Sequence, residues 1–398
     1  MIKRLRVVLS VVILFAALLV PAAALAAESD VVVSGGGWGH GIGMSQYGAK
    51  GMAEEGTTAA QILNYFYDGT ALGTVGAGVP DPGSLWVGLF QNSTEVGFQA
   101  VGGPLDLCQA NDGEGPCPTQ TAQPGENWVF TAVGAATCQF FKNEAPVGNP
   151  GDCDASISWD NQPDTRVKLS ATGREYGRGT MRFRAVPFNG AVFHTSLQIA
   201  LEDYLYGIDE VPSSWHPEAL RAQAIAARSY GVKDALTVGN VETNTGAQLS
   251  CWCHLFSDTR DQNYVGWAKE AQVVGTTDYG ALWKSAVNET ASSVVTNGGS
   301  VISTFYFSST GGATENIEDV WNTSPRSYLV SKPDPWSQLP ANPHGTWSET
   351  ISYDAFAAAL GFDQVHSASI VAVYASGSPR QIDVVGSVGG IQQTKQFT

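Results

Sequence analysis

The sequence feature that most constrains the fold is the stretch Leu201 to Lys233, in which a short loop runs into an unusually apolar helix. Its letters are LEDYLYGIDEVPSSWHPEALRAQAIAARSYGVK. Pro217 suits the first position of a helix, and Glu218 suits the positive field of the first turn. The pattern from Ala219 to Ala227 is apolar on nearly every face, which predicts a helix buried near the centre of a domain.

Two charged residues of this stretch stand in apolar surroundings. Arg228 shares a helix face with Ala224 and Val232, and a charge there is costly unless it is paired or meets a ligand. Glu210 lies just before the helix, beside Val211 and other apolar residues. A carboxyl among apolar groups has a raised pKa and is suited to act as a general acid.

The length and composition indicate a globular, exported protein. At 398 residues the chain is long enough for two domains, or for one domain with insertions. The apolar fraction of 43% and the 11 Trp fit a sizeable core, whereas charged residues make up only 15% and Gly accounts for 45 residues. This mixture favours a loop-rich extracellular protein over a highly charged cytosolic one.

The N-terminus predicts a secretory signal peptide over residues 1–27. Lys3, Arg4 and Arg6 precede the apolar run Val7 to Val20, and an Ala-rich stretch follows. The alternative is an uncleaved anchor, because the apolar stretch is nearly long enough to span a membrane. No later segment is apolar enough to span, so we expect the mature protein to be secreted, either free or associated with the cell wall, with no membrane span.

The net charge excludes nucleic acid as a partner. Removal of the three N-terminal cations takes the net charge from −16 to −19, since residues 1–27 contain no acid. A chain this acidic has no basic surface for a phosphate backbone.

The six Cys of an exported chain indicate disulfides. Cys108 and Cys117 flank a turn rich in Gly and Pro, and Cys138 and Cys153 flank a second turn. Pairing of near neighbours is the natural expectation, although four Cys permit three pairings.

The chain divides into three parts after residue 27, and the predicted fold class is α+β. Residues 28–70 carry a strand, a glycine-rich turn and two helices, the second capped by Thr57 or Thr58. Residues 71–164 hold four Cys and short β-like runs, which indicate a disulfide-stapled β insertion. Residues 165–398 return to the main domain, which we expect to be a mixed, β-rich domain around the buried Ala-rich helix. It includes alternating strands over 166–199, a strand over 301–308 and a C-terminal helix with strands.

Three groups of motifs resemble one family. GWGHGIGMSQYGAKGMAEEGTTAAQILNYFYDGT opens the mature chain, and ALEDYLYGIDEVPSSWHPEALRAQAIAARSY forms its centre. DTRDQNYVGW, FYFSSTGGATE and SYLVSKPDPWS then follow in order. Together they resemble the SpoIID/LytB family, that is, stage II sporulation protein D and the LytB amidase enhancer. The glycine–histidine signature lies at the N-terminal end here, whereas in the family it commonly follows the central segment.

The resemblance implies a lytic transglycosylase that acts on the glycan strands of peptidoglycan. The catalytic Glu of the family precedes a Met-Pro-x-x-Trp-like segment, and the matching residue here is Glu210 in EVPSSW. Such an enzyme needs one acid/base rather than the two carboxylates of an ordinary glycosidase, because the C6 hydroxyl of the muramic acid is the nucleophile. Cleavage of MurNAc–GlcNAc bonds would leave 1,6-anhydro-MurNAc ends.

Polar residues of the two glycine-rich turns are candidates for binding sugar hydroxyls and N-acetyl groups. The predicted substrate-binding residues are His40, Ser45, Gln46, Tyr47, Arg228, Ser308, Ser309, Thr310 and Glu315. For the turn residues, a purely structural role within the loop is the alternative.

Cys251, Cys253 and His254 form a compact C-x-C-H cluster. No cofactor is required for the expected reaction, but some members of the family bind zinc through Cys and His, so two thiolates and an imidazole would suit a structural zinc ion. His216 is one guess for the fourth ligand. The alternative in an exported protein is a disulfide between Cys251 and Cys253.

Two rival functions remain open. The same fold would serve a non-catalytic peptidoglycan-binding protein that stimulates a separate N-acetylmuramoyl-L-alanine amidase, as LytB-type members do. A glycoside hydrolase would cut the same strands but leave reducing muramic ends. The sequence does not rank naked against peptide-bearing glycan.

Overall fold

The computed structural model describes residues 30–109, 117 and 119–398, so the predicted signal peptide lies outside the described residues. Two units pack separately, one formed by 35–347 with 372–380 and a smaller one formed by 30–34, 348–371 and 381–398. Within the described ranges, no helix has the length and apolar character that a membrane crossing needs. The mixture of helices and strands confirms the α+β class.

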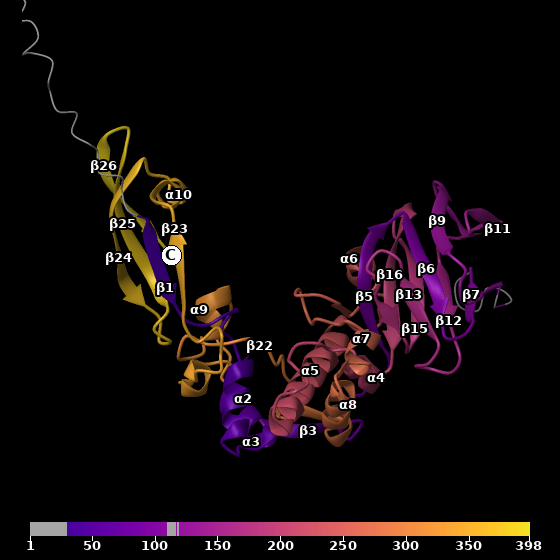
Figure 1. Ribbon diagram of the computed structural model, residues 1–398, viewed down its shortest axis with the longest axis horizontal. Coiled ribbons are helices and arrows are strands. Elements are labelled where there is room, and N and C mark those ends of the chain that lie inside the picture. The colour runs from indigo at the N-terminus through magenta and orange to yellow at the C-terminus, as the bar shows by residue number, and fades with distance from the viewer. Residues whose placement is uncertain (1–29, 110–116, 118) are drawn as a thin grey trace, which may run out of the picture. The chain divides into compact units, whose positions relative to one another are not determined.

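The smaller unit holds a two-stranded sheet, a three-stranded sheet and a helix, and its C-terminal strands are drawn in yellow in Figure 1. Ser352 caps its helix by accepting a hydrogen bond from the backbone N–H of Ala355. The predicted C-terminal helix is therefore confirmed, but the residues before it form a strand that pairs with the N-terminal strand. The elements are β1 (Val31–Gly35), β23 (Trp347–Ile351), α10 (Tyr353–Ala359), β24 (Gln364–Val373), β25 (Pro379–Val388) and β26 (Ile391–Phe397).

Most strands of the larger unit belong to two large sheets, and the others form smaller sheets of two to four strands. One has the order β11-β10-β9-β6-β13-β14 and the other β17-β5-β16-β15-β12-β7-β8. The first contains β11 (Ala145–Gly151), β10 (Thr137–Lys142), β9 (Trp128–Gly134), β6 (Glu95–Val101), β13 (Arg166–Leu169) and β14 (Glu175–Tyr176). The second contains β17 (Leu255–Phe256), β5 (Leu85–Ser93), β16 (Asn189–Ile199), β15 (Thr180–Val186), β12 (Ala155–Ser158), β7 (Leu105–Cys108) and β8 (Gln120–Ala122).

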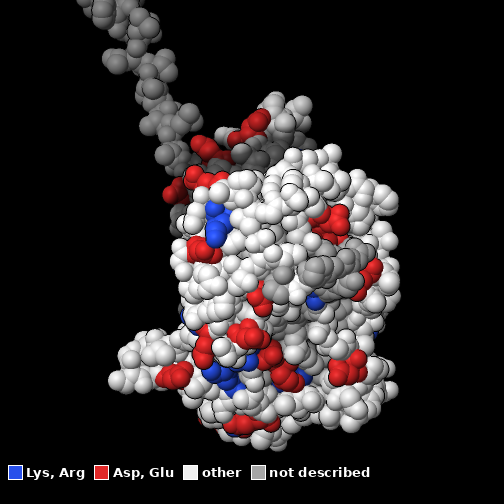
Figure 2. Space-filling view, turned by 90° about the vertical axis from the view of Figure 1, so that its right-hand side faces the viewer, with Lys and Arg blue, Asp and Glu red and all other residues white. Residues whose placement is uncertain are grey.

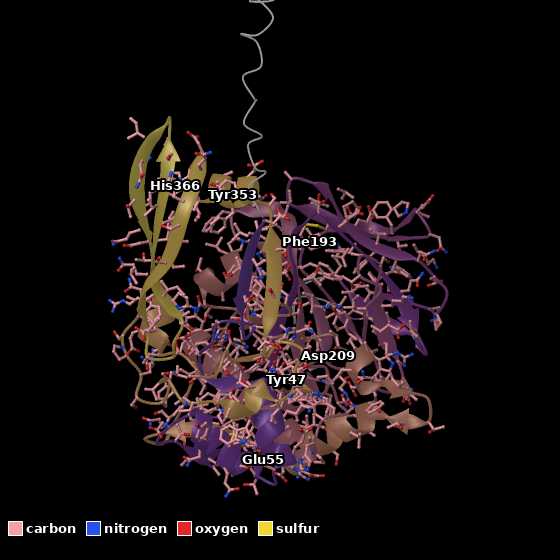
Figure 3. The ribbon with its side chains drawn as sticks, turned by 60° about the vertical axis from the view of Figure 1, so that its left-hand side comes forward. Tyr47, Glu55, Phe193, Asp209, Tyr353 and His366 are labelled. Carbon is pink, nitrogen blue, oxygen red and sulfur yellow. A yellow bond between two sulfur atoms is a disulfide. The ribbon has the colours of Figure 1, made fainter. Side chains whose placement is uncertain are left out.

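Aromatic side chains fill the core of these strands. Phe130 stacks on Phe183 at 5.2 Å and meets Phe193, which Figure 3 labels, at 5.1 Å. The strands from residues 71–164 do not form sheets of their own, because β6 pairs with β13 and β5 with β16. Disulfides Cys108–Cys117 and Cys138–Cys153 confirm the pairing of near neighbours. On the face drawn in Figure 2, acidic side chains are scattered over a largely uncharged surface with few basic ones.

Helix α5 (Pro217–Val238) is buried, as its sequence predicts, because it lies between two hydrophobic cores. Leu220, Ala224 and Ala227 join the core of the two sheets. Ala222 and Ile225 join a second core built largely from the N-terminal helices. The helices and the strand around α5 are α2 (Gln46–Glu54), α3 (Ala59–Phe66), α4 (Leu201–Tyr206), α8 (Tyr279–Glu289) and β20 (Ser293–Asn297).

The local signals at helix ends are confirmed. Pro217 occupies the first turn of α5, and Thr58 caps α3 in a capping box with Gln61. Helix α2 begins at Gln46 and not at Met44, because Met44 and Ser45 form the short strand β2.

The predicted strand over 301–308 is shorter than expected. Only β21 (Ser300–Val301) and β22 (Tyr306–Phe307) are extended, because the chain between them turns and Thr304 donates its hydroxyl to the Ala226 carbonyl at 2.7 Å. Strand β22 pairs in parallel with β2 (Met44–Ser45), and this places the two glycine-rich turns together. The remaining elements are β3 (Ala71–Val75), β4 (Gly78–Val79), α6 (Thr245–Ser250), α7 (Trp267–Glu270), β18 (Val273–Val274), β19 (Thr277–Asp278), α9 (Ile317–Trp321) and the 3₁₀ helix η1 (Pro335–Gln338).

Candidate active site

The loop that carries Glu210 is held by the segment DTRDQNYVGW. Ile208 and Tyr264 form an antiparallel bridge. On either side of it, the Asp209 N–H donates to the Asn263 carbonyl at 2.9 Å, and the Val265 N–H donates to the Gly207 carbonyl at 2.8 Å. This pairing holds residues 258–266 outside any helix, and α7 begins only at Trp267.

The carboxyl of Glu210 is largely removed from water and is held by two donors. Its Oε1 accepts the backbone N–H of Asn263 at 2.6 Å, and the hydroxyl of Tyr306 also bonds to it. Burial raises the pKa of Glu210 above the ordinary carboxyl value, while these two hydrogen bonds oppose that rise. The negative charge of Asp209 also raises the pKa of Glu210, and the positive charge of Lys269 lowers it.

A buried amide fixes the direction of the hydrogen bond from Tyr306. Gln262 is 0% exposed, and its Nε2 donates to the Ala227 carbonyl at 3.3 Å and to the Tyr306 hydroxyl at 2.8 Å. The hydroxyl of Tyr204 donates to Gln262 Oε1 at 2.8 Å. Because a carbonyl only accepts, the amide has one orientation, and the oxygen of Tyr306 is an acceptor for it. The proton of Tyr306 is therefore free to be donated to Glu210.

The neighbouring acid has a different partner. Lys269, whose side chain is 1% exposed, donates to Asp209 Oδ1 at 2.8 Å and to the Val211 carbonyl at 2.7 Å. This ion pair holds both ends of the Glu210 loop. Asp209 thus has a cationic partner, whereas the carboxyl of Glu210 is held by hydrogen bonds.

The two glycine-rich turns meet beside this loop. The Tyr47 N–H donates to the Ser308 carbonyl at 3.0 Å, and the Glu315 N–H donates to the Gly41 carbonyl at 2.8 Å. Gln46 Nε2 donates to the backbone carbonyl of Glu210 at 3.3 Å, which connects the first turn to the acid. The structure therefore brings together three regions that the sequence singled out. Tyr47 and Glu55 mark the two ends of α2 in Figure 3.

Several predicted sugar-binding side chains are turned into the protein. Ser45 is 0% exposed and shares a hydrogen bond of 2.7 Å with Ser337. The hydroxyl of Thr310 donates to Asp334 Oδ2 at 2.9 Å, and that of Ser309 accepts from Asn342 at 2.6 Å. These hydroxyls tie the second glycine turn to residues 334–342.

Two buried polar atoms, one beside Gln46 and one in Glu315, have no hydrogen-bond partner. Gln46 reaches Gln223 Oε1 at 3.5 Å, and Gln223 Nε2 is buried without a hydrogen-bond partner. Glu315 is 9% exposed, and its Oε2 also lacks a partner. Ser308 keeps a partly exposed side chain.

Arg228 is fully buried, and its partner is an acid other than Glu210. Its Nη2 donates to Glu202 Oε2 at 2.7 Å and to the Val287 carbonyl at 3.1 Å. Its Nη1 reaches Thr290 and the Ser293 carbonyl at 3.4 and 3.2 Å. With 0% exposure, this guanidinium holds α4 and α8 to α5 instead of facing a cleft.

Aromatic rings border the loop on the side of the first glycine turn. Tyr47 meets Trp215 at 5.1 Å and His344 at 6.1 Å, and His344 stacks on Trp38 at 5.6 Å. On the other side of that turn, burial lowers the pKa of His40, whose ring meets Phe307 at 5.4 Å. No signal in the sequence pointed to His344 as part of this surface.

The cysteine cluster is closed by a disulfide between Cys251 and Cys253. His254 accepts the Trp86 N–H at its Nδ1 at 3.1 Å, and its Nε2 lies 3.0 Å from the Gly239 carbonyl. His216 caps α5. In the described part of the chain, no group of three or more His, Cys, Asp and Glu is arranged to hold a metal, so these residues do not fit the predicted zinc site.

Comparison with known proteins identifies the central region. The model of the SpoIID family, described as stage II sporulation protein, matches residues 191–297. The matched region runs from β16 through α5 to β20 and contains Glu210, Gln262 and Arg228.

Curated relatives agree with the resemblance to the SpoIID/LytB family. The chain is 32% identical over 180 residues to stage II sporulation protein D of Bacillus subtilis (strain 168), covering 43% of this chain and 50% of that protein. It is 31% identical over 144 residues to the amidase enhancer of the same strain, covering 36% of this chain and 16% of that protein. The chain thus spans about half the length of the sporulation relative and a smaller share of the amidase enhancer.

Proposed function

We propose that the protein is a secreted peptidoglycan lytic transglycosylase in which Glu210 is the single acid/base. The observation that carries this proposal is the environment of the Glu210 carboxyl. Burial raises its pKa, and hydrogen bonds from Asn263 and Tyr306 fix its position. A general acid is helped by a raised pKa and by a carboxyl held in a fixed direction.

The proposed reaction needs one proton carrier. Glu210 donates its proton to the glycosidic oxygen while the bond from C1 of MurNAc to the GlcNAc oxygen breaks. The resulting carboxylate then accepts the proton of the MurNAc C6 hydroxyl as that oxygen bonds to C1. The product carries a 1,6-anhydro-MurNAc end, no water is consumed, and Glu210 returns to its protonated form.

The surroundings support a substrate with sugar hydroxyls and amides. The half-buried ring of Tyr47 and the partly exposed side chain of Ser308 lie on the turns beside the Glu210 loop. We retain these two residues and His40 as proposed substrate contacts. Gln46, Ser45, Ser309 and Thr310 would act by shaping the turns, and the proposal does not require Arg228 or a metal.

The test is digestion of purified glycan strands, with and without stem peptides, followed by mass spectrometry. We expect products with 1,6-anhydro ends from the wild-type protein and none from Glu210→Gln. Glu242→Gln, which changes an exposed carboxyl, is the matched control and should cleave normally. Products heavier by one water would indicate a hydrolase, and unchanged cleavage by Glu210→Gln would refute the role of this residue.

A second candidate function rests on the similarity to an amidase enhancer. In that case the protein would bind peptidoglycan and stimulate a separate N-acetylmuramoyl-L-alanine amidase without cutting glycan. Glycan binding without cleavage, together with faster amidase turnover that persists in Glu210→Gln, would favour it.

A further inference from the structure

Four aromatic rings contact one another in series, and we call them the aromatic row. It consists of Trp215, Tyr47, His344 and Trp38, in that order, with centroid distances of 5.1, 6.1 and 5.6 Å. Trp38 and His344 are stacked at an interplanar angle of 26°. The row brings together residues that are more than 300 positions apart in the chain.

The outer end of the row is an exposed Trp on a rigid backbone. Trp38 is 66% exposed, although its backbone exchanges two hydrogen bonds with Ser309, at 2.7 and 3.1 Å. Gly37 and Gly39 on either side have φ of +89° and +112°, and a Cβ at either would lie within 3 Å of neighbouring atoms. A large apolar ring that is presented to water by a fixed backbone gains little from folding, which indicates a binding role.

The inner end of the row reaches the candidate acid. Trp215 closes the turn after Glu210 by donating its N–H to the Pro212 carbonyl at 3.1 Å. Tyr47 follows Gln46, whose amide donates to the Glu210 carbonyl. A ligand that lies along the row would therefore extend away from the site of cleavage.

The chemistry of the row suits a sugar polymer. Pyranose rings present apolar C–H faces that stack on aromatic rings, and their hydroxyl edges remain in water. A preorganised surface loses little conformational entropy on binding.

We propose that the aromatic row is a stacking platform for successive N-acetylated sugar rings, and that Trp38 sets the length of glycan that binds well. This inference rests on the proposed function for its ligand class, because it places the row next to Glu210. It goes beyond that function by assigning chain-length preference to a residue remote from the chemistry.

The test measures binding of N-acetylglucosamine oligomers of two to six units to the Glu210→Gln protein by calorimetry. We expect affinity to rise with length. Trp38→Ala should weaken binding of the longest oligomers by about tenfold, the effect of losing one buried aromatic face, and leave the dimer unchanged. Phe188→Ala is the matched control, because Phe188 is 96% exposed and lies in the larger unit away from the row.

The outcomes separate the row from the catalytic proposal. Equal affinity of Trp38→Ala and its parent for long oligomers overturns the row, as does an absence of binding by every oligomer. Loss of long-oligomer binding in Trp38→Ala supports the row even where the wild-type protein cleaves no glycan, and then only the catalytic proposal fails. If the wild-type protein cleaves glycan but Trp38→Ala does not change the binding of long oligomers, the aromatic row fails and the catalytic proposal stands.

Discussion

The ion pair between Glu202 and Arg228 offers the sharpest test of how the structure is held together. It joins α4, which leads into the Glu210 loop, to the centre of α5. The side chain of Arg228 is 0% exposed, while that of Glu202 is 33% exposed. Glu202→Gln keeps the shape of the side chain but leaves a buried guanidinium without a counter-charge.

The expected loss of stability follows from the contacts that remain. Removing one partner of a buried pair costs about 3–5 kcal/mol, because the remaining charge stays away from water. Arg228 would still donate to two backbone carbonyls and to Thr290, and Glu202 is partly reached by solvent. The low end of the range therefore applies, which is a free energy of unfolding lower by about 3 kcal/mol.

The assay is urea unfolding followed by Trp fluorescence. With an m value of about 3 kcal/mol per molar, this loss moves the midpoint down by about 1 M. Asp258→Asn is the control, since the pair Arg260–Asp258 is about half exposed on both sides and should change stability by less than about 1 kcal/mol. The double variant Glu202→Leu/Arg228→Met should recover much of the loss, because no buried charge remains.

A urea midpoint of Glu202→Gln within about 0.2 M of the wild type would be a change no larger than that expected of the control. It would show that Glu202 does not compensate the buried charge of Arg228. Another acid near Arg228 would then have to compensate its positive charge. A loss in the double variant as large as in Glu202→Gln would also contradict the electrostatic explanation.

Four further outcomes follow from the structure. Because burial raises the pKa of folded Glu210, ionisation above the ordinary carboxyl pKa of 4.5 favours the unfolded chain, so Glu210→Gln should melt higher than wild type at pH 7 but not below pH 4. Tyr306→Phe removes a hydrogen bond that favours the carboxylate, and the basic limb of the pH–rate profile on denuded glycan should move to higher pH. Burial raises the pKa of Asp234 to about 7, so stability should fall as the pH rises from the ordinary pKa of 3.8 to 7, and Asp234→Asn should abolish that fall in thermal melts. Since Cys251 and Cys253 are paired, thiol titration of the native protein should find no reactive thiol at these positions before reduction, and elemental analysis should find no stoichiometric zinc.

Local features of the chain were predictable because they depend on neighbours in sequence. Pro217 begins α5, Thr58 caps α3, and Cys138 pairs with Cys153 fifteen residues away. The burial of α5 followed from a pattern that is apolar all round. Glu210 was chosen from its apolar neighbours, and its raised pKa agrees with that choice.

Other features required the tertiary structure. The sequence named Arg228 as a buried charge that needs a partner, but only the packing of α4 on α5 supplies Glu202. Ser45 and Thr310 were expected to meet sugars, whereas Ser337 and Asp334, far along the chain, hold their hydroxyls.

The sequence by itself determined the buried helix and pointed to the acid that precedes it, since each rests on a pattern of adjacent residues. Only the tertiary structure decided the partners of that acid. Asn263, Tyr306 and the amide of Gln262 reach it from distant segments. Hydrogen-bond direction and removal from water depend on atoms that are brought together by folding, and no local pattern specifies them.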